Sequence, residues 1–143
     1  MTNIGHMVQL TAEEVARVAE FRAALRRFLR GSERHARAAG LTPQRYLLLL
    51  MIKGAADHSE QSTVTELAER LQLAQSTVTE LVRRAEETGL VERERSSADG
   101  RIAHLRLTAE GERRLAQSFT SNESERRALR DAFRHLEGSV LRS

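Results

Sequence analysis

The chain has 143 residues, a formal net charge of +3, no cysteine and a single proline. Its length suits one domain, or one compact unit that shares its core with a partner chain, and its lack of cysteine excludes disulfides, thiolate metal ligands and cysteine nucleophiles. The longest apolar run, residues 46–52, is much shorter than the ~20 residues of a membrane span, and the N-terminus has no signal-peptide pattern, so a cytoplasmic protein is expected.

A long N-terminal helix is expected from Thr11, because Thr11 and Glu14 have the spacing of a capping box, and Gly40 is suited to end it. Apolar residues recur along it at spacings of three and four and therefore share one face. Arginines at every fourth position form a stripe that is either a solvated face or a contact for acids of a partner subunit or for DNA phosphates. The apolar face consists of Val18, Phe21, Leu25 and Phe28, and the stripe of Arg22, Arg26, Arg30 and Arg34.

The next helix is expected to begin with Thr42 as N-cap and Pro43 at the first helical position, and Gly54 closes it. Residues 46–52 are apolar almost all round, so this helix is expected to be buried. Residues 55–62 are expected to form a polar loop.

Two short helices follow, joined by a turn at residues 72–74 that is short enough to cross them steeply. The first begins at either Thr63 or Thr65, and the second spans about residues 75–88. One side of the second helix is apolar and the other is short and polar, as a helix that reads a DNA major groove requires, although an ordinary amphipathic surface helix would show the same pattern. The apolar side holds Val78, Leu81, Val82 and Ala85, and the polar side Ser76, Glu80 and Arg83, flanked by Thr77, Thr79 and Arg84.

Residues 90–95 and 102–107 are expected to form a hairpin, since apolar and polar residues alternate in the second segment. Asp99 and Gly100 are a strong turn signal, which places Arg101 at or near the hairpin tip. A hairpin after two crossed helices predicts a mainly α fold with a small β-hairpin wing, a winged helix-turn-helix. This order of elements favours DNA binding over an ordinary surface helix.

A further helix is expected to begin at Thr108 and to break within residues 118–122, a weak helical stretch. Asn122 and Glu125 have capping-box spacing and would start a terminal amphipathic helix, which Gly138 would end. The apolar face of that helix consists of Leu129, Ala132, Phe133 and Leu136.

The winged segment is not basic. Between residues 63 and 107, seven arginines face eight acids, so the net charge of the segment is −1 (7 − 8). Affinity for DNA must therefore come from the placement of a few arginines rather than from bulk charge.

Five short motifs occur in order: TELA at residues 65–68, QSTVT at 75–79, ETGLV at 87–91, DGR at 99–101 and LTAEG at 107–111. On these motifs the chain resembles the MarR/SlyA family of bacterial transcription regulators. The resemblance implies one unit over residues 1–143, with a winged helix-turn-helix lobe at 41–107 and dimerisation helices at 11–39 and 108–143.

The resemblance also implies an obligate homodimer, expected to be a repressor, that binds a palindromic double-stranded DNA site. Each subunit would place its recognition helix in a major groove and its wing in the adjacent minor groove. Glu80 and Arg84 belong to the candidate DNA-binding set through their place on the polar side. Carried over by motif, Gln75, Ser76, Thr77 and Thr79 face DNA, Arg83 lies near backbone and bases, and Arg101 enters the minor groove with Asp99 as its orienting partner.

Three departures from the family pattern bear on these expectations. Ala74 stands where the family often has Ser or Asp, which removes an N-cap worth ~1 kcal/mol from the recognition helix unless a neighbouring hydroxyl substitutes. Glu80 stands where a basic residue is common, so it must pair with Arg83 or Arg84, or accept a hydrogen bond from a cytosine amino group. The helix after Thr108 is short, which puts the dimer geometry in question.

Family members commonly respond to small aromatic or anionic molecules bound between the dimerisation helices and the DNA-binding lobe. By resemblance, Phe21, Arg45, Tyr46 and Leu49 are candidates for such a site, and the alternative is that they are core or interface residues. The five histidines lack metal-ligand spacing, and no catalytic motif appears, so neither an enzyme nor a cofactor is expected. The remaining alternative function is a winged-helix protein-interaction module that has lost DNA binding.

Overall fold

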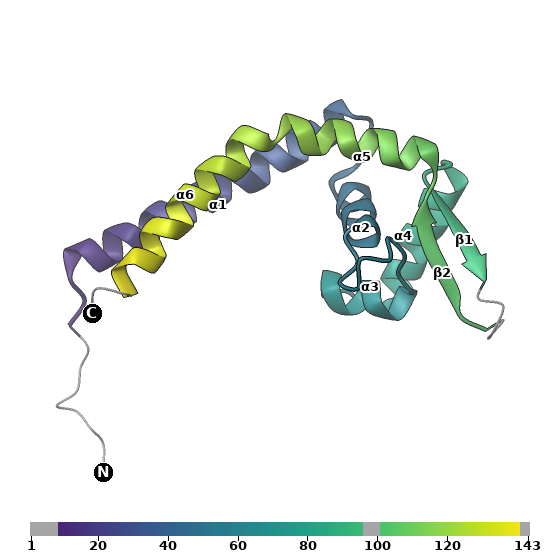
Figure 1. Cartoon of the computed structure of the whole chain (residues 1–143), viewed down its shortest axis with the longest axis horizontal. Helices are drawn as coiled ribbons and strands as arrows, with labels where there is room; N and C mark the ends of the chain where they lie inside the picture. The colour runs from purple at the N-terminus through teal and green to yellow at the C-terminus, as the bar shows by residue number, and fades with distance from the viewer. Residues whose placement is uncertain (1–8, 96–100, 141–143) are drawn as a thin grey trace, which may run out of the picture. The chain divides into compact units, whose positions relative to one another are not determined.

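The computed structural model describes residues 9–95 and 101–140, and these form six helices and two strands (Figure 1). They group into two compact units: Ser32–Ser121, here called the winged unit, and the described parts of Met1–Gly31 and Asn122–Ser143, here called the two-helix unit. No described helix is long and apolar enough to cross a membrane. The helices are α1 (Ala12–Ala38), α2 (Pro43–Lys53), α3 (Val64–Leu71), α4 (Gln75–Glu87), α5 (Ala109–Ser121) and α6 (Glu123–Val140), and the strands are β1 (Val91–Arg95) and β2 (Ala103–Leu107).

The winged unit has one hydrophobic core, to which all of its helices and both strands contribute. Leu48 and Ile52 of α2 are fully buried in it, as the apolar run of this helix predicts. Ala36 of α1 and Leu115 of α5 also pack into this core. The winged unit therefore includes more of the chain than the DNA-binding lobe expected at residues 41–107.

The prediction that α2 is buried is confirmed for most of its apolar residues, but not for Leu47. Leu47 remains 41% exposed, whereas Leu48 and Leu49 beside it are fully buried. Helix α2 packs against α3, α4, α5 and β2, and these neighbours cover most but not all of its circumference. One strip of the helix faces away from the core of the unit.

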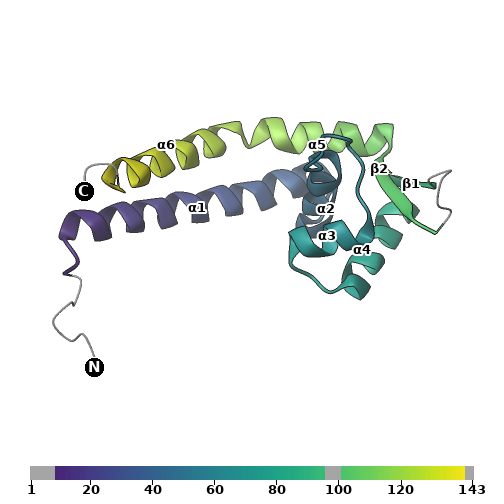
Figure 2. The ribbon, with the colours of Figure 1, turned by 60° about the horizontal axis from the view of Figure 1, so that its bottom comes forward.

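Thr63 rather than Thr65 begins α3, which settles the alternative left open by the sequence. The Thr63 hydroxyl accepts from the Glu66 backbone N–H at 3.2 Å, and the Thr63 N–H donates to the Glu66 carboxylate at 2.9 Å. This reciprocal capping box fixes the entry into the helix-turn-helix, whose two helices cross steeply (Figures 1 and 2). The expected caps at Thr11, Thr42 and Thr108 are also present.

Gly40 follows the end of α1, as expected, and Gly89 follows the end of α4, with φ angles of +78° and +76°. Glycine adopts this left-handed conformation without steric cost. After α4, the Leu90 N–H donates to the Ala85 carbonyl at 2.9 Å and turns the chain directly into β1. The recognition helix and the wing are thus joined by a tightly bonded turn.

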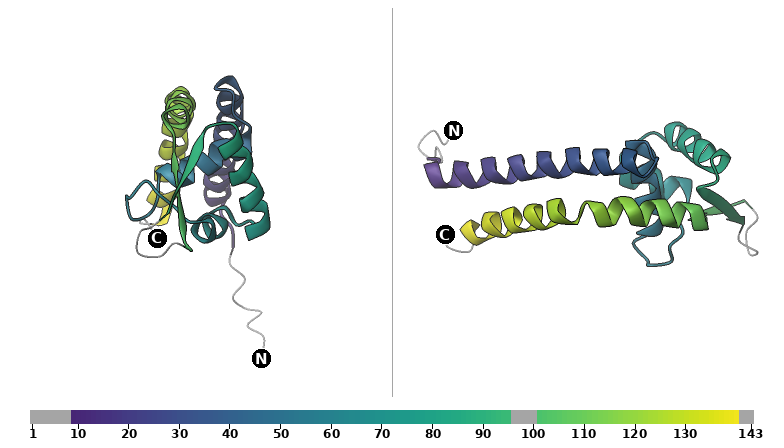
Figure 3. Two further views of the ribbon diagram at one scale, coloured as in Figure 1. Left: turned by 90° about the vertical axis from the view of Figure 1, so that its right-hand side faces the viewer. Right: turned by 90° about the horizontal axis from the view of Figure 1, so that it is seen from above.

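Strands β1 and β2 pair antiparallel with Val91 opposite Leu107 and Arg95 opposite Ala103, beside the helices of the winged unit (Figure 3). The segment expected to be only a polar loop adds a third partner. The Ser62 N–H donates to the Leu105 carbonyl at 3.1 Å, and the Leu105 N–H donates to the Ser62 carbonyl at 2.8 Å. A bridge of one residue leaves no periodic pattern, so the sequence did not reveal it.

In the two-helix unit, α1 and α6 run antiparallel and side by side (Figures 2 and 3). The rings of Phe21 and Phe133 lie 6.1 Å apart between centroids and are tilted by 54°. The prediction that Gly138 ends the last helix is wrong, because α6 continues to Val140. A helical glycine costs only ~1 kcal/mol relative to alanine, which the packing of the helix can offset.

The capping box expected at Asn122 and Glu125 does not form. The Asn122 side chain is buried, and its two polar atoms have no hydrogen-bond partner among the described residues. A Cβ atom on Gly31 would lie 3.1 Å from the Asn122 Oδ1, so the side chain is turned toward α1 instead of capping α6. The Arg126 N–H donates to the Asn122 carbonyl at 3.1 Å, and the break between α5 and α6 is confined to Asn122.

Candidate nucleic-acid interface

Helix α4 has the two sides that the sequence predicts. Its apolar side is buried in the winged unit through Val78, Leu81, Val82 and Ala85. Its first turn and a half carries exposed amide and hydroxyl side chains, and such groups can bond DNA phosphates or base edges. These side chains are Gln75, Ser76, Thr77 and Thr79.

The start of α4 lacks a side-chain cap, as Ala74 predicts. The neighbouring Gln75 amide donates instead to the Thr65 hydroxyl of α3 at 3.1 Å, which ties the two helices of the motif together. Because Ala74 has no side-chain acceptor, no side chain caps the first backbone N–H groups of α4, and a ligand at this end of the helix could bond to them. Helix N-termini of this kind favour phosphate groups.

Glu80 lies at the middle of the polar side and pairs with both arginines that the sequence offered as alternatives. Its Oε2 accepts from the Arg83 Nε at 2.9 Å, its Oε1 accepts from the Arg83 Nη2, and the Arg84 Nε donates to Oε1 at 3.1 Å. The Arg83 Nη1 donates to Glu87. Hydrogen bonds from Arg83 and then Arg84 lower the pKa of the Glu80 carboxyl to about 2, so Glu80 is ionised at any pH near neutrality.

Other arginines of the winged unit are also paired with acids. Arg93 Nε lies 2.9 Å from Glu86, and Arg106 lies 2.8 Å from Glu92 and 3.4 Å from Glu94. Glu92 and Arg106 are opposite each other in the hairpin register. The acids and arginines that nearly balance in the sequence thus form local ion pairs. The cross-strand pair of Glu92 and Arg106 could have been predicted from the register.

The wing arginine Arg101 is exposed and lies two residues before β2, which begins at Ala103. Asp99, expected to orient it, and the turn glycine Gly100 lie outside the described residues. The winged unit therefore carries an exposed cation on the hairpin in addition to the polar side of α4.

Gln44 is a candidate residue that the sequence did not reveal. It lies on the first turn of α2, and it lines a surface hollow together with Ser76, Thr77, Glu80 and Arg84 of α4. The second helix of the fold thereby adds an exposed amide to the polar side of the recognition helix. Only the tertiary packing of α2 against α4 brings these residues together.

The four candidate effector residues do not share one environment. Tyr46 and Leu49 are buried in the core of the winged unit, and Arg45 is half-buried there. Phe21 belongs to the two-helix unit, where it contacts Phe133. For Tyr46 and Leu49 the packing agrees with the alternative that they are core residues.

Comparison with known proteins places this arrangement in a family. The sequence profile of the MarR family matches residues 39–102, the segment that holds α2, α3, α4 and the start of the wing. The HTH-type transcriptional regulator YsmB of Bacillus subtilis is 29% identical over 101 residues, which cover 71% of this chain and 66% of that protein. The chain belongs to the MarR family.

Two solved structures have the same fold. The apo form of MarR from Escherichia coli matches with a TM-score of 0.67 at 18% identity, covering 94% of this chain and 98% of that one. The transcriptional regulator Tm0710 of Thermotoga maritima matches with a TM-score of 0.63 at 25% identity, covering 85% and 91%. This MarR-family chain is a winged helix-turn-helix transcription regulator of a non-enzymatic family, for which the family implies DNA binding.

Proposed function

We propose that this MarR-family regulator is a homodimeric repressor that binds a palindromic operator in double-stranded DNA and is released by a small aromatic or anionic effector. The observation that carries the proposal is the exposed polar side of α4, residues 75–79, anchored by a fully buried apolar side. A helix fixed in this way can present hydroxyl and amide groups to a major groove. Arg101 supplies the cation for the adjacent minor groove, whose negative potential favours arginine.

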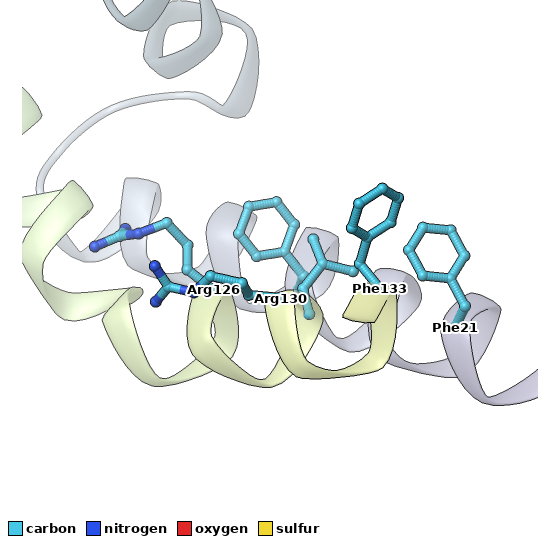
Figure 4. Close-up of a pocket in the computed structure, with 6 residues that line it drawn as sticks. Phe21, Arg126, Arg130 and Phe133 are labelled. Atoms are coloured by element: carbon cyan, nitrogen blue, oxygen red, sulfur yellow. The ribbon is translucent and has the colours of Figure 1, made fainter. Parts of the chain in front are cut away.

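The two-helix unit supports the dimer part of the proposal. Phe21, Phe28, Leu129 and Phe133 line an apolar groove with two arginines. Figure 4 shows the rings of Phe21 and Phe133 together, with the guanidinium ends of Arg126 and Arg130 to one side. Two helices alone cannot cover all of their apolar surface, and in homodimers a second copy covers such a patch through a two-fold axis. Further exposed apolar residues of α1 are Val15, Val18 and Leu29.

The dimer is tested by Val18→Glu, which places a charge on this apolar surface of α1. We expect a monomer in sedimentation experiments and a loss of affinity for the inverted repeat of about 100-fold or more, because one recognition helix binds without its partner. Ala16→Glu is the matched control. Ala16 is also exposed, and at about 100° per residue it points to the opposite side of α1 from Val18. A Val18→Glu protein that stays dimeric at micromolar concentration would contradict this interface.

Release by an effector would result from thermodynamic linkage between effector binding and DNA binding. A molecule that binds more tightly to the form that does not fit the operator weakens DNA binding by the ratio of its two affinities. Tyr46 and Leu49 have too little exposed surface to contact such a molecule without repacking. Arg45 and Phe21, which are half-buried, are better suited to contact it.

One observation favours the alternative of a protein-interaction module. Arg83, Arg84, Arg93 and Arg106 are all paired with acids of the same unit, which leaves less positive charge for DNA phosphates. A module of this kind would not be retained on DNA at low salt, whereas a DNA-binding regulator would. Retention on DNA fragments at low ionic strength therefore separates the two functions.

A further inference from the structure

We propose that Glu80 is a base-reading residue that selects a C·G base pair in each half of the operator, with Arg83 orienting its carboxylate and donating to the guanine. The inference rests on the proposed DNA-binding function. It adds a base specificity for the Glu80 carboxylate to that function. The geometry of the Glu80–Arg83 pair supports it. Glu80 stands on the polar side of α4 in the same surface hollow as Ser76 and Thr77.

The pair has a fixed geometry. Arg83 donates to both carboxylate oxygens of Glu80 through its Nε and Nη2 atoms, so the two planar groups meet in a bidentate fork. Arg84 donates to one of the same oxygens from the next turn of the helix. The Nη1 atom of Arg83 donates to the Glu87 carboxylate. The carboxylate is therefore oriented before DNA arrives, and orienting it at the interface costs little conformational entropy.

Both Glu80 and Arg83 keep hydrogen-bonding groups that their bidentate pair does not use. A guanidinium has five N–H groups, and the bonds to Glu80 and Glu87 use three of those of Arg83. The Oε2 atom of Glu80 accepts from the Arg83 Nε and has a further lone pair. The Glu80 side chain is 45% exposed, so this capacity is accessible from outside the unit.

The charges of the cluster cancel. Two arginines, 83 and 84, face two glutamates, 80 and 87, so the middle of α4 carries no net charge toward the DNA backbone. An unpaired acid at this point would repel phosphates, and the pairing removes most of that repulsion. Glu80 remains ionised because Arg83 and Arg84 lower its pKa, so it acts only as an acceptor.

A C·G base pair is complementary to this arrangement. In the major groove it offers the N4 amino donor of cytosine beside the O6 and N7 acceptors of guanine. Glu80 accepts from the cytosine amino group, and the remaining N–H groups of Arg83 face the guanine acceptors. A glutamine in place of Glu80 would instead match the N6 donor and N7 acceptor of adenine.

The experiment is selection of bound duplexes from a random library by the full-length wild-type protein, by Glu80→Gln and by Glu87→Gln. Both variants remove one negative charge from a residue that pairs with Arg83, so they are matched in charge. We expect the wild type to select a C·G pair at one position of each half-site. Glu80→Gln should lose that preference, shift toward A·T at that position only, and bind the wild-type site roughly 5- to 100-fold more weakly. Glu87→Gln should keep the wild-type sequence preference.

Two outcomes would overturn the inference while leaving the proposed function intact. One is an identical selected site for wild type and Glu80→Gln, which would make Glu80 only a neutralising partner of Arg83. The other is the same change of preference in Glu87→Gln, which would trace the effect to the release of Arg83 rather than to a contact of Glu80. A wild-type protein that selects no DNA sequence at all would overturn the proposed function, and this inference with it.

Discussion

Arg101→Ala is expected to weaken binding to the operator by roughly 1–3 kcal/mol, about 5- to 150-fold, while the protein stays dimeric. The winged unit has a net charge of −1 between residues 63 and 107, and several of its arginines are held in ion pairs with neighbouring acids. Arg101 is exposed on the wing and is the cation proposed to enter the minor groove, so it should carry a large share of the favourable electrostatic contact. Fluorescence anisotropy of a labelled operator duplex measures the loss, and sedimentation checks the dimer.

The control for the wing is Arg134→Ala. Arg134 is an exposed arginine of the two-helix unit, 3.9 Å from Asp131, and its removal changes the net charge by the same amount as Arg101→Ala. We expect its operator affinity to remain within about twofold of the wild type, since Arg134 is not among the proposed DNA contacts and a single exposed charge acts weakly at physiological salt. Equal effects of the two substitutions would mean that bulk charge, not the wing, determines affinity.

Gly111→Ala is expected to destabilise the protein by roughly 2–3 kcal/mol or more, with a fall in Tm on the order of 10 °C. A Cβ atom at Gly111 would lie 2.2 Å from the Leu90 carbonyl oxygen, which is backbone and cannot swing aside. The same oxygen accepts from the Thr108 N–H at 3.0 Å, and the Gly111 N–H donates to the Thr108 hydroxyl at 3.1 Å. The added methyl group would therefore separate α5 from the turn that joins α4 to the wing.

Gly138→Ala is the matched control for this substitution. Gly138 also lies within a helix, but a Cβ atom there has nothing within 4 Å. Alanine should stabilise α6 by about 0.5–1 kcal/mol, because glycine is the poorer helix former. Thermal unfolding followed by circular dichroism compares the two proteins, and a Gly111→Ala protein as stable as the wild type would disprove the close approach at Leu90.

Features set by neighbours in the sequence could be predicted. The caps at Thr11, Thr42 and Thr108 depend on residues three positions apart, and the pairing of Glu80 with Arg83 and Arg84 depends on spacings of three and four along one helix. The polar side of α4 follows from the same periodicity. The motif that contains Gly111 could be recognised, but the Leu90 carbonyl that requires a glycine there could not.

Features that join distant segments could not be predicted. Ser62 bonds to Leu105 across more than forty residues, and Gln44 approaches α4 only because two helices pack together. Asn122 has the spacing of a cap, yet it turns toward Gly31 of α1, since burial against another helix competes with local capping. The pattern of residues along the sequence does not show such contacts until the fold is known.

The most direct test of DNA reading is the salt dependence of wild-type binding to its selected inverted repeat. We expect the logarithm of the association constant to fall linearly with the logarithm of salt concentration between about 50 and 200 mM, with a slope near −0.9 for each phosphate contact. Random DNA of the same length should bind more weakly at every salt concentration. Failure to bind either duplex at the lowest salt would contradict a DNA-binding function and favour a protein-interaction module.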